Sequence, residues 1–237
     1  MNLSALIFSA GLGTRLFPLT ANKPKALIEF QEKTLLEHAL LKVMKAGISH
    51  IVVNVHHFGE QIMDFINQHH FNANIEISDE REKLMDTAGG LKFAEPYFKT
   101  CDAILLYNVD VITDMDLKKF CKNGLKAESR KRNIATLAVR HRQTNRYFLF
   151  EEPELRLCGW KNTSTNEKKL CYEVDNPISL AFSGIHIVDK KILELIPKNE
   201  KLSFTPLYLK LAKYYLIQGY LHNEDTWKDM GKMEAFE

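Results

Sequence analysis

Two glycines and two cations near the amino terminus could hold a chain of phosphates. Gly11 and Gly13 follow a buried apolar run, where the lack of a Cβ lets the backbone turn sharply and bring its N–H groups close to an anion. Arg15 can grip phosphate oxygens with two parallel donors, and Lys25 supplies a compact positive charge. The pattern is not a P-loop, because G-x-x-x-x-G-K-[ST] is absent, and it is not the dinucleotide fingerprint G-x-G-x-x-G, because Leu16 stands where the third glycine would fall. The sequence therefore predicts a phosphate-binding loop of another kind.

The elements that must position this loop alternate between strands and helices. Continuous apolar runs predict strands at residues 3–8, 51–55, 75–77, 103–107, 134–139 and 180–188. Apolar positions at helical spacing predict helices at residues 35–44, 61–66, 84–98 and 204–218. Such alternation is typical of βαβ units, so we expect an α/β fold with a Rossmann-like, mixed and mostly parallel sheet flanked by helices.

The residue pattern changes at residues 140–177, where charged and polar turns interrupt short aromatic and aliphatic runs. This pattern predicts a small β-rich hairpin insertion on the sheet. No Gly/Ser/Pro-rich linker and no repeat divides the 237 residues, and 45% of them are hydrophobic, enough for a sizeable core. We therefore expect a single domain over residues 1–237, without intrinsic disorder.

Composition and charge exclude several other classes of protein. The net charge of +2 is too mild to indicate nucleic-acid binding, and the basic run 126–132, which contains Glu128, is more typical of a solvated turn. The cysteines are too widely spaced for a disulfide framework or a structural metal, at positions 101, 121, 158 and 171. No basic leader and no run of ~20 apolar residues is present, so we expect a cytoplasmic protein without a membrane partner.

The loop and the segments after it resemble the sugar-1-phosphate nucleotidyltransferases, or NDP-sugar pyrophosphorylases. Residues 11–20 and 24–27 follow the family pattern, which is close to G-x-G-[ST]-R-[LM]-x-P-L-T-x4-K-[AP]-L. Four later segments resemble further motifs of the family, at residues 86–90, 108–111, 182–186 and 227–231. Residues 54–61 and 78–80 look most like the N-acetylmuramate-1-phosphate uridylyltransferase branch and the mannose- or heptose-1-phosphate guanylyltransferase branches.

The resemblance implies a nucleotide-diphospho-sugar transferase fold and a reaction between two partners, a nucleoside triphosphate and a sugar 1-phosphate, that gives an NDP-sugar and pyrophosphate. UTP with N-acetylmuramate 1-phosphate is the favoured pair, and GTP with a mannose or heptose 1-phosphate is the alternative. By resemblance Arg15 would favour the departing pyrophosphate, Lys25 would bridge the two reacting phosphates, and Asp110 and Asp229 would bind Mg²⁺. Nucleotide contacts are implied for Ala10, Gly11, Gly13, Thr14, Glu80, Thr87 and Gly89, and sugar contacts for Asn108, Ser183 and Gly184.

Other interpretations stay open at this point. Glu80 could belong to a solvated acidic turn over residues 79–82. Val109 replaces a motif glycine, which would suit a non-catalytic nucleotide-binding or regulatory relative, although such a binder has little reason to keep all four charged site residues. A glycosyltransferase would show an Asp-x-Asp motif, but Asp114 and Asp116 stand at a predicted helix start rather than at a strand end.

Overall fold

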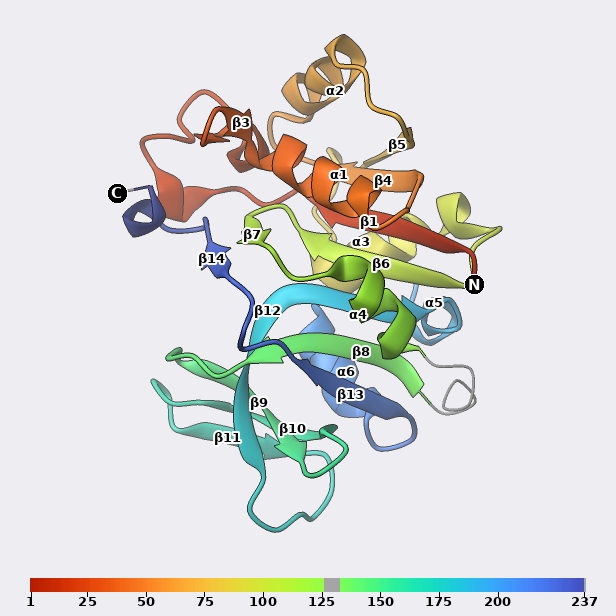
Figure 1. Cartoon of the computed structure of the whole chain (residues 1–237), viewed down its shortest axis with the longest axis vertical. Coiled ribbons are helices and arrows are strands. Elements are labelled where there is room, and N and C mark those ends of the chain that lie inside the picture. The colour runs from red at the N-terminus through yellow and green to blue at the C-terminus, as the bar shows by residue number, and fades with distance from the viewer. Residues whose placement is uncertain (126–132, 237) are drawn as a thin grey trace.

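The computed structural model describes residues 1–125 and 133–236, and a ten-stranded mixed sheet forms its centre (Figure 1). The strands are β1 (Leu3–Phe8), β4 (His50–Val55), β5 (Asn74–Asp79), β6 (Ala103–Asn108), β8 (Asn133–Arg140), β9 (Arg146–Glu151), β10 (Arg156–Asn162), β11 (Glu167–Leu170), β12 (Ile178–Asp189) and β13 (Leu216–Leu221). Their order is β11-β10-β13-β8-β12-β6-β1-β4-β5, and β9 pairs with both β10 and β12. The basic run 126–132 lies outside the described residues.

Parallel pairing is concentrated in β5, β4, β1 and β6. All but the last residue of β6 are buried, because helices cover both faces of this part of the sheet. The predicted α/β class and mixed sheet are confirmed, but the described sheet is not mostly parallel, since six of its ten strand pairings are antiparallel. The other half of the sheet is mainly antiparallel: β12 runs antiparallel to β6, β8 and β9, whereas β13 is parallel to β8.

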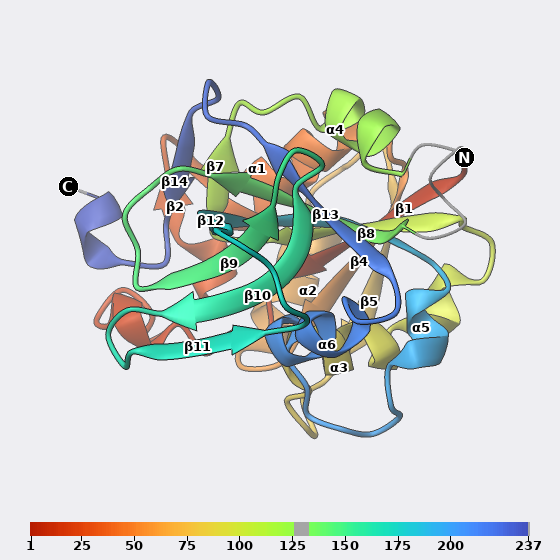
Figure 2. The same cartoon turned by 90° about the horizontal axis from the view of Figure 1, so that it is seen from below.

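Helices cover the sheet in two layers (Figure 2). One layer holds α1 (Leu35–Lys45), α2 (Gly59–Gln68) and α4 (Leu117–Gly124), and the other holds α3 (Asp86–Phe93), α5 (Ile192–Leu195) and α6 (Phe204–Leu211). Successive residues of a strand face opposite layers. In β1, Leu6 packs in the core under α3, α5 and α6, while Ala5 and Ile7 pack in the core under α1, α2 and α4.

Two predicted helices are wrong in their extent. The helix expected over residues 204–218 ends at Leu211, and Leu216–Leu221 is instead the strand β13. This strand pairs with β8, which lies more than 75 positions earlier in the chain, and Leu216 is opposite Asn133. The pairing outweighs the local helical spacing of the apolar residues. The helix expected over residues 84–98 is interrupted, because α3 ends at Phe93 and Pro96 lies at the start of a separate 3₁₀ turn, Glu95–Phe98.

The region 140–177 is β-rich, and its strands pair in succession as antiparallel hairpins, β9 with β10 and β10 with β11. Its strands β9, β10 and β11 continue the main sheet, since β9 pairs with β12 and β10 pairs with β13. Two small sheets complete the fold: β14 (Trp227–Asp229) with β7 (Val111–Thr113), and β2 (Glu29–Phe30) with β3 (Lys33–Thr34). None of the helices in the described part of the chain has both the length and the apolar character of a bilayer span.

Candidate functional site

A cleft of about 430 Å³ opens where β1, β4, β5 and β6 end at their carboxyl termini. Open α/β sheets bind their ligands at this edge. Eight residues predicted from the sequence line the cleft: Ala10, Gly11, Arg15, Lys25, Glu80, Thr87, Asn108 and Asp110. The fold therefore brings together residues from four strand ends that are up to a hundred positions apart in the sequence.

A lysine and an aspartate form an ion pair at the centre of this edge. Lys25 opens the short 3₁₀ turn Lys25–Leu27, and its Nζ donates a hydrogen bond of 2.6 Å to Oδ2 of Asp110. The side chains of the pair are only 15% and 11% exposed. Opposite charges attract more strongly where water is partly excluded, so the pair holds the two groups in a defined position.

The side chains of Arg15, Asp110 and Asp229 converge around Gly231. A Cβ at Gly231 would lie 2.8 Å from Asp229 Oδ1, 2.9 Å from Arg15 Nη2 and 2.9 Å from Asp110 Oδ2. The N–H of Gly231 donates to Asp229 Oδ1 at 2.9 Å. Only a residue without a side chain fits where these three charged groups converge.

The small sheet of β7 and β14 is what joins the two aspartates (Figure 1). Asp229 pairs with Val111 across this sheet, and the N–H of Met230 donates to the Asp110 carbonyl at 2.8 Å. Within residues 1–125 and 133–236, no group of three or more His, Cys, Asp or Glu side chains could hold a metal ion by itself. Two carboxylates completed by phosphate oxygens and water are the ligand set that Mg²⁺ prefers, so the residues present fit this ion.

The glycine loop owes its shape to Asn54 at the end of β4. The Asn54 side-chain oxygen accepts hydrogen bonds from the N–H groups of Ser9 at 2.7 Å and Ala10 at 3.3 Å. Gly13 has a φ of 66°, and a Cβ there would lie 2.8 Å from Thr20 Cγ2, so this turn requires glycine. The Thr20 hydroxyl donates to the Gly13 carbonyl at 3.0 Å and closes the loop.

Glu80 is buried, and its interpretation as a solvated acidic turn is wrong. Only 2% of the residue is exposed. Its carboxylate accepts hydrogen bonds from Asn54 Nδ2 at 2.8 Å and from the Met85 N–H at 3.3 Å. Burial raises the pKa of Glu80, while these two donors oppose the rise. Gly90 lets the carboxylate approach, because a Cβ there would lie 2.8 Å from Glu80 Oε1.

Gly13, Thr14 and Gly89 do not line the cleft, although the sequence predicts nucleotide contacts for all three. A Cβ at Gly89 would lie 2.5 Å from the carbonyl oxygen of Glu200, so this glycine permits a close approach of α3 to residues 200–202. Thr14 begins the 3₁₀ turn Thr14–Leu16 and is exposed. Thr87 does line the cleft, and its hydroxyl also accepts the N–H of Phe204 at 3.1 Å. Nucleotide binding by these residues stays a prediction.

The predicted sugar-side residues are held together by β12. Gly184 has a φ of 77°, and a Cβ there would lie 3.0 Å from Asn108 Nδ2, so Gly184 packs directly against a residue of the cleft. The Ser183 hydroxyl is hydrogen-bonded to His222 Nε2 at 2.7 Å and is fully buried. Burial lowers the pKa of His222, which favours the neutral imidazole. The carbonyl of Ser183 also accepts the Trp227 Nε1–H at 2.9 Å, so this residue exposes no group to the cleft, and sugar contact by Ser183 stays a prediction.

Five residues that were not predicted from the sequence also line the cleft: Phe8, Asn54, Leu84, Asp86 and Lys201. Asn54 could have been found, because it lies near the end of the predicted strand 51–55, at the edge where ligands bind. Lys201 carries no such signal: it lies in the connection between α5 and α6, and only the docking of that connection on α3 brings it to the cleft.

Val109, which replaces the motif glycine, does not point into the cleft. Its side chain is fully buried in the core under α1, α2 and α4, and its N–H donates to the Phe8 carbonyl at 3.2 Å. The β-branch therefore packs away from Asp110 and leaves the carboxylate accessible from the cleft.

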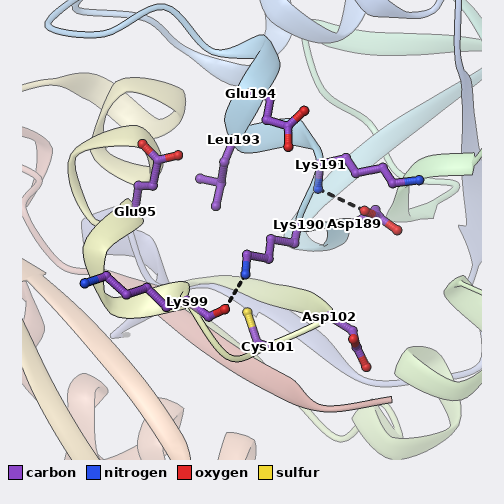
Figure 3. A pocket seen from close by; sticks show the side chains of 9 residues that line it. All are labelled: Glu95, Lys99, Cys101, Asp102, Asp189, Lys190, Lys191, Leu193 and Glu194. Atoms are coloured by element: carbon purple, nitrogen blue, oxygen red, sulfur yellow. Dashed lines mark hydrogen bonds between the residues drawn. The ribbon is translucent and has the colours of Figure 1, made fainter.

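A larger cavity, of about 660 Å³, lies at the opposite end of β6, between the 3₁₀ turn Glu95–Phe98 and α5 (Figure 3). Several of its charged groups are engaged with neighbouring backbone or charged groups. Lys190 donates to the Lys99 carbonyl, and the Asp189 carboxylate accepts the N–H of Lys191 at 2.9 Å. Four carboxylates and three ammonium groups line this cavity, so it offers no excess of positive charge for an anionic substrate.

Comparison with known proteins places this geometry in a family. The nucleotidyl transferase family matches residues 4–237. An N-acetylmuramate alpha-1-phosphate uridylyltransferase from Caulobacter vibrioides is 40% identical over 93 residues, which are 38% of this chain and 38% of that protein. A mannose-1-phosphate guanyltransferase from Yarrowia lipolytica is 29% identical over 245 residues, which cover 99% of this chain and 62% of that protein. The chain thus spans less than two thirds of the length of these two relatives.

Solved structures share the fold. A UDP-glucose pyrophosphorylase complexed with UDP-glucose superposes with a TM-score of 0.80 at 18% identity, covering 100% of this chain and 96% of that one. HddC from Yersinia pseudotuberculosis, complexed with GMP-PN, gives a TM-score of 0.75 at 19% identity, covering 98% and 96%. The family match over nearly the whole length, together with this fold, shows that the chain belongs to the nucleotidyl transferase family.

Proposed function

We propose that the chain transfers a nucleotidyl group from a nucleoside triphosphate to a sugar 1-phosphate, giving an NDP-sugar and pyrophosphate. UTP with N-acetylmuramate 1-phosphate is the pair we favour, because two uridylyltransferases of that name match the chain, one of them over 97% of it. GTP with a mannose or heptose 1-phosphate is the alternative, because mannose-1-phosphate guanyltransferases also match.

The observation that carries the proposal is the convergence of Arg15, Asp110 and Asp229 around Gly231, with Lys25 paired to Asp110. Nucleotidyl transfer asks a protein mainly to align two phosphates and to neutralise the charge that grows on their oxygens. Two cations and two carboxylates at one strand edge supply this electrostatic arrangement. A pure nucleotide binder would not need the second aspartate.

In the proposed reaction an oxygen of the sugar phosphate attacks the α-phosphorus, and the bond to pyrophosphate breaks. The backbone of the loop at Ala10 and Gly11, which Asn54 holds in place, would receive the triphosphate. Arg15 would hold the departing pyrophosphate, and Lys25 would bind oxygens of both reacting phosphates. Asp110 and Asp229 would hold Mg²⁺, which when bound lowers the charge on phosphate oxygens.

A glycosyltransferase does not fit the positions of the other aspartates. Asp116 caps α4, where its carboxylate accepts the Lys119 N–H at 2.9 Å. Asp114 accepts the Thr226 N–H at 2.7 Å. Both carboxylates of this Asp-x-Asp pair thus accept hydrogen bonds from backbone N–H groups and do not line the cleft.

Pyrophosphate release tests the proposed function. The chain is incubated with Mg²⁺ and each of UTP, GTP, CTP and dTTP, against N-acetylmuramate, hexose and heptose 1-phosphates. We expect release that depends on both substrates and is fastest with UTP and N-acetylmuramate 1-phosphate. Fastest release with GTP and mannose or heptose 1-phosphate would select the alternative. No release with any pair, by a chain that still binds a nucleotide, would overturn the proposal in favour of a binding module.

A further inference from the structure

An arginine that the family motifs do not include stacks on the strand that carries Asp229. Arg142 follows β8, and the central carbon of its guanidinium group lies 4.5 Å from the centre of the Trp227 ring. Trp227 and Asp229 are two residues apart in β14 and therefore point to the same face of that strand. Through the indole ring, the guanidinium group is therefore anchored to the strand that carries Asp229.

The segment around Ser183 holds the guanidinium group and the indole ring in place. Arg142 Nη2 donates to the Phe182 carbonyl at 3.2 Å, and Trp227 Nε1 donates to the Ser183 carbonyl at 2.9 Å. Gly184, the next residue, packs on Asn108 in the cleft. The arginine is thus fixed by the β12 segment that also shapes the sugar side of the site.

One N–H donor of the Arg142 side chain has no hydrogen-bond partner among the described residues. Its Nε is buried and has no hydrogen-bond partner in the part of the chain that the structure describes, although native proteins pair most buried donors. A guanidinium group has five N–H donors in a planar fork, which matches the oxygens of a phosphate or a carboxylate. Burial lowers the pKa of Arg142, and the nearby Asp229 opposes this shift, so the group remains a cation at neutral pH.

A second arginine shows which feature matters. Arg156 also stacks on an aromatic ring, 4.6 Å from the centre of Tyr172, and its Nε is likewise buried without a partner among the described residues. It lies in β10, where its backbone pairs with Glu151 of β9 and Gln218 of β13. Stacking and an unpaired donor therefore do not define a site by themselves. The distinguishing observation for Arg142 is that its ring partner, Trp227, belongs to the strand that carries Asp229.

We propose that Arg142 binds an oxyanion of the sugar-phosphate substrate, on the sugar side of Asp229. This inference rests on the proposed function, because it assumes that the acceptor enters next to the two aspartates. The oxyanion is either the reacting 1-phosphate or a carboxylate that the sugar carries. Stacking on Trp227 fixes the plane of the fork, so the residue would select acidic acceptors by geometry as well as by charge.

Direct binding tests this role without requiring turnover. Calorimetric titration measures the affinity for N-acetylmuramate 1-phosphate, for mannose 1-phosphate and for UTP in the wild type, Arg142→Met and Arg156→Met. Methionine keeps an apolar stem over the aromatic ring and removes the charge. We expect Arg142→Met to weaken binding of at least one sugar 1-phosphate by ~10-fold or more, the scale of a lost hydrogen bond to a charged group, and to leave UTP binding within ~2-fold.

The panel identifies which oxyanion Arg142 binds. Equal weakening for both sugar 1-phosphates points to the 1-phosphate, and weakening for N-acetylmuramate 1-phosphate alone points to the carboxylate. Arg142→Lys, which keeps the charge without the fork, should recover part of the affinity. Thermal melting of each variant checks that the fold is intact, and the Arg156→Met protein shows the effect of losing a stacked arginine elsewhere.

Two results would overturn the inference: sugar-phosphate affinity that Arg142→Met changes no more than Arg156→Met, or an equal loss of UTP affinity. Wild-type protein that binds sugar 1-phosphates without releasing pyrophosphate would contradict the proposed function alone, and the affinities would still decide the role of Arg142. Wild-type protein that binds no sugar 1-phosphate would contradict both.

Discussion

At the scale of single residues, the ion pair between Lys25 and Asp110 is the contact on which the proposed reaction depends most. Each partner neutralises the other at 2.6 Å in a part of the cleft where both side chains are mostly covered. Removing one charge changes the electrostatic field at the reacting phosphates, and it also leaves the other charge without its partner. The effect on catalysis should therefore exceed the effect of an exposed charge nearby.

We expect Lys25→Ala and Asp110→Asn each to lower kcat by at least ~100-fold, the scale for the loss of one preorganised electrostatic partner. Steady-state pyrophosphate release measures this change. Asp114→Asn is the matched control, because Asp114 is an exposed carboxylate that holds the Thr226 N–H and lies outside the cleft. Near wild-type kcat in either site variant would show that its assigned role is wrong.

At the scale of elements, α3 is positioned by the connection between α5 and α6. The N–H groups of Ala88 and Gly89 both donate to the Leu202 carbonyl, at 2.8 and 2.9 Å. The Leu202 N–H in turn donates to the Met85 carbonyl at 3.0 Å. This docking carries Lys201 to the cleft and explains the glycine at position 89 by packing.

Gly89→Ala should lower the free energy of unfolding by about 1–3 kcal/mol, because the new methyl group would meet the Glu200 carbonyl, which is backbone and cannot rotate away. Urea unfolding measures the change. Gly11→Ala is the control, since its Cβ would find no neighbour closer than Lys25 Nζ at 4.0 Å, and it should stay within about 0.5 kcal/mol of the wild type. Equal stability of the two variants would contradict the close approach.

The contact between β12 and α6 should make stability depend on pH. His186 is fully buried and hydrogen-bonded to the Tyr208 hydroxyl, and burial lowers the pKa of His186 to about 3. The imidazole is therefore neutral in the folded chain, whereas in the unfolded chain it gains a proton near its ordinary pKa of about 6.5. The unfolded state binds more protons in this range, so stability falls as the pH drops from about 6.5 toward 3.

His186→Gln, which keeps a hydrogen-bond acceptor for Tyr208, should remove one proton from this pH dependence. The free energy of unfolding of the wild type should fall by up to about 1.4 kcal/mol per pH unit more steeply than that of the variant. Urea titrations at pH 4, 5, 6 and 7 give both slopes. Parallel slopes would mean that His186 is protonated in the folded protein.

At the scale of the whole molecule, all four cysteines are buried in the folded chain, and none of these thiols forms a disulfide. Burial raises the pKa of every one of them, to about 12 for Cys121 and about 11 for Cys158. A thiol reacts as its thiolate, so the native fold protects these groups both by cover and by protonation.

A thiol reagent at neutral pH should therefore label none of the four cysteines in the native protein and all four in urea. Intact mass spectrometry counts the added groups over time, and the unfolded sample is its own control. Rapid labelling of one cysteine under native conditions would show that the element that carries it opens locally.

The local chemistry of the glycine loop could be predicted from the order of residues alone. The glycine loop with Arg15 and Lys25 could be identified because a sharp turn after a buried strand depends on residues adjacent in the chain. The parallel strands β1, β4 and β6 were predictable for a similar reason, since burial on both faces leaves continuous apolar runs.

The other features of the fold and the site depend on contacts between residues that are far apart in the sequence. Residues 216–221 have an apolar pattern that fits a helix, and only the edge of β8 makes them a strand. The burial of Glu80 under Asn54, the engagement of the Ser183 hydroxyl by His222 and the stacking of Arg142 on Trp227 each join residues at least 26 positions apart. No local pattern encodes such contacts, because the free energy that favours them appears only when the sheet has brought its distant strands together.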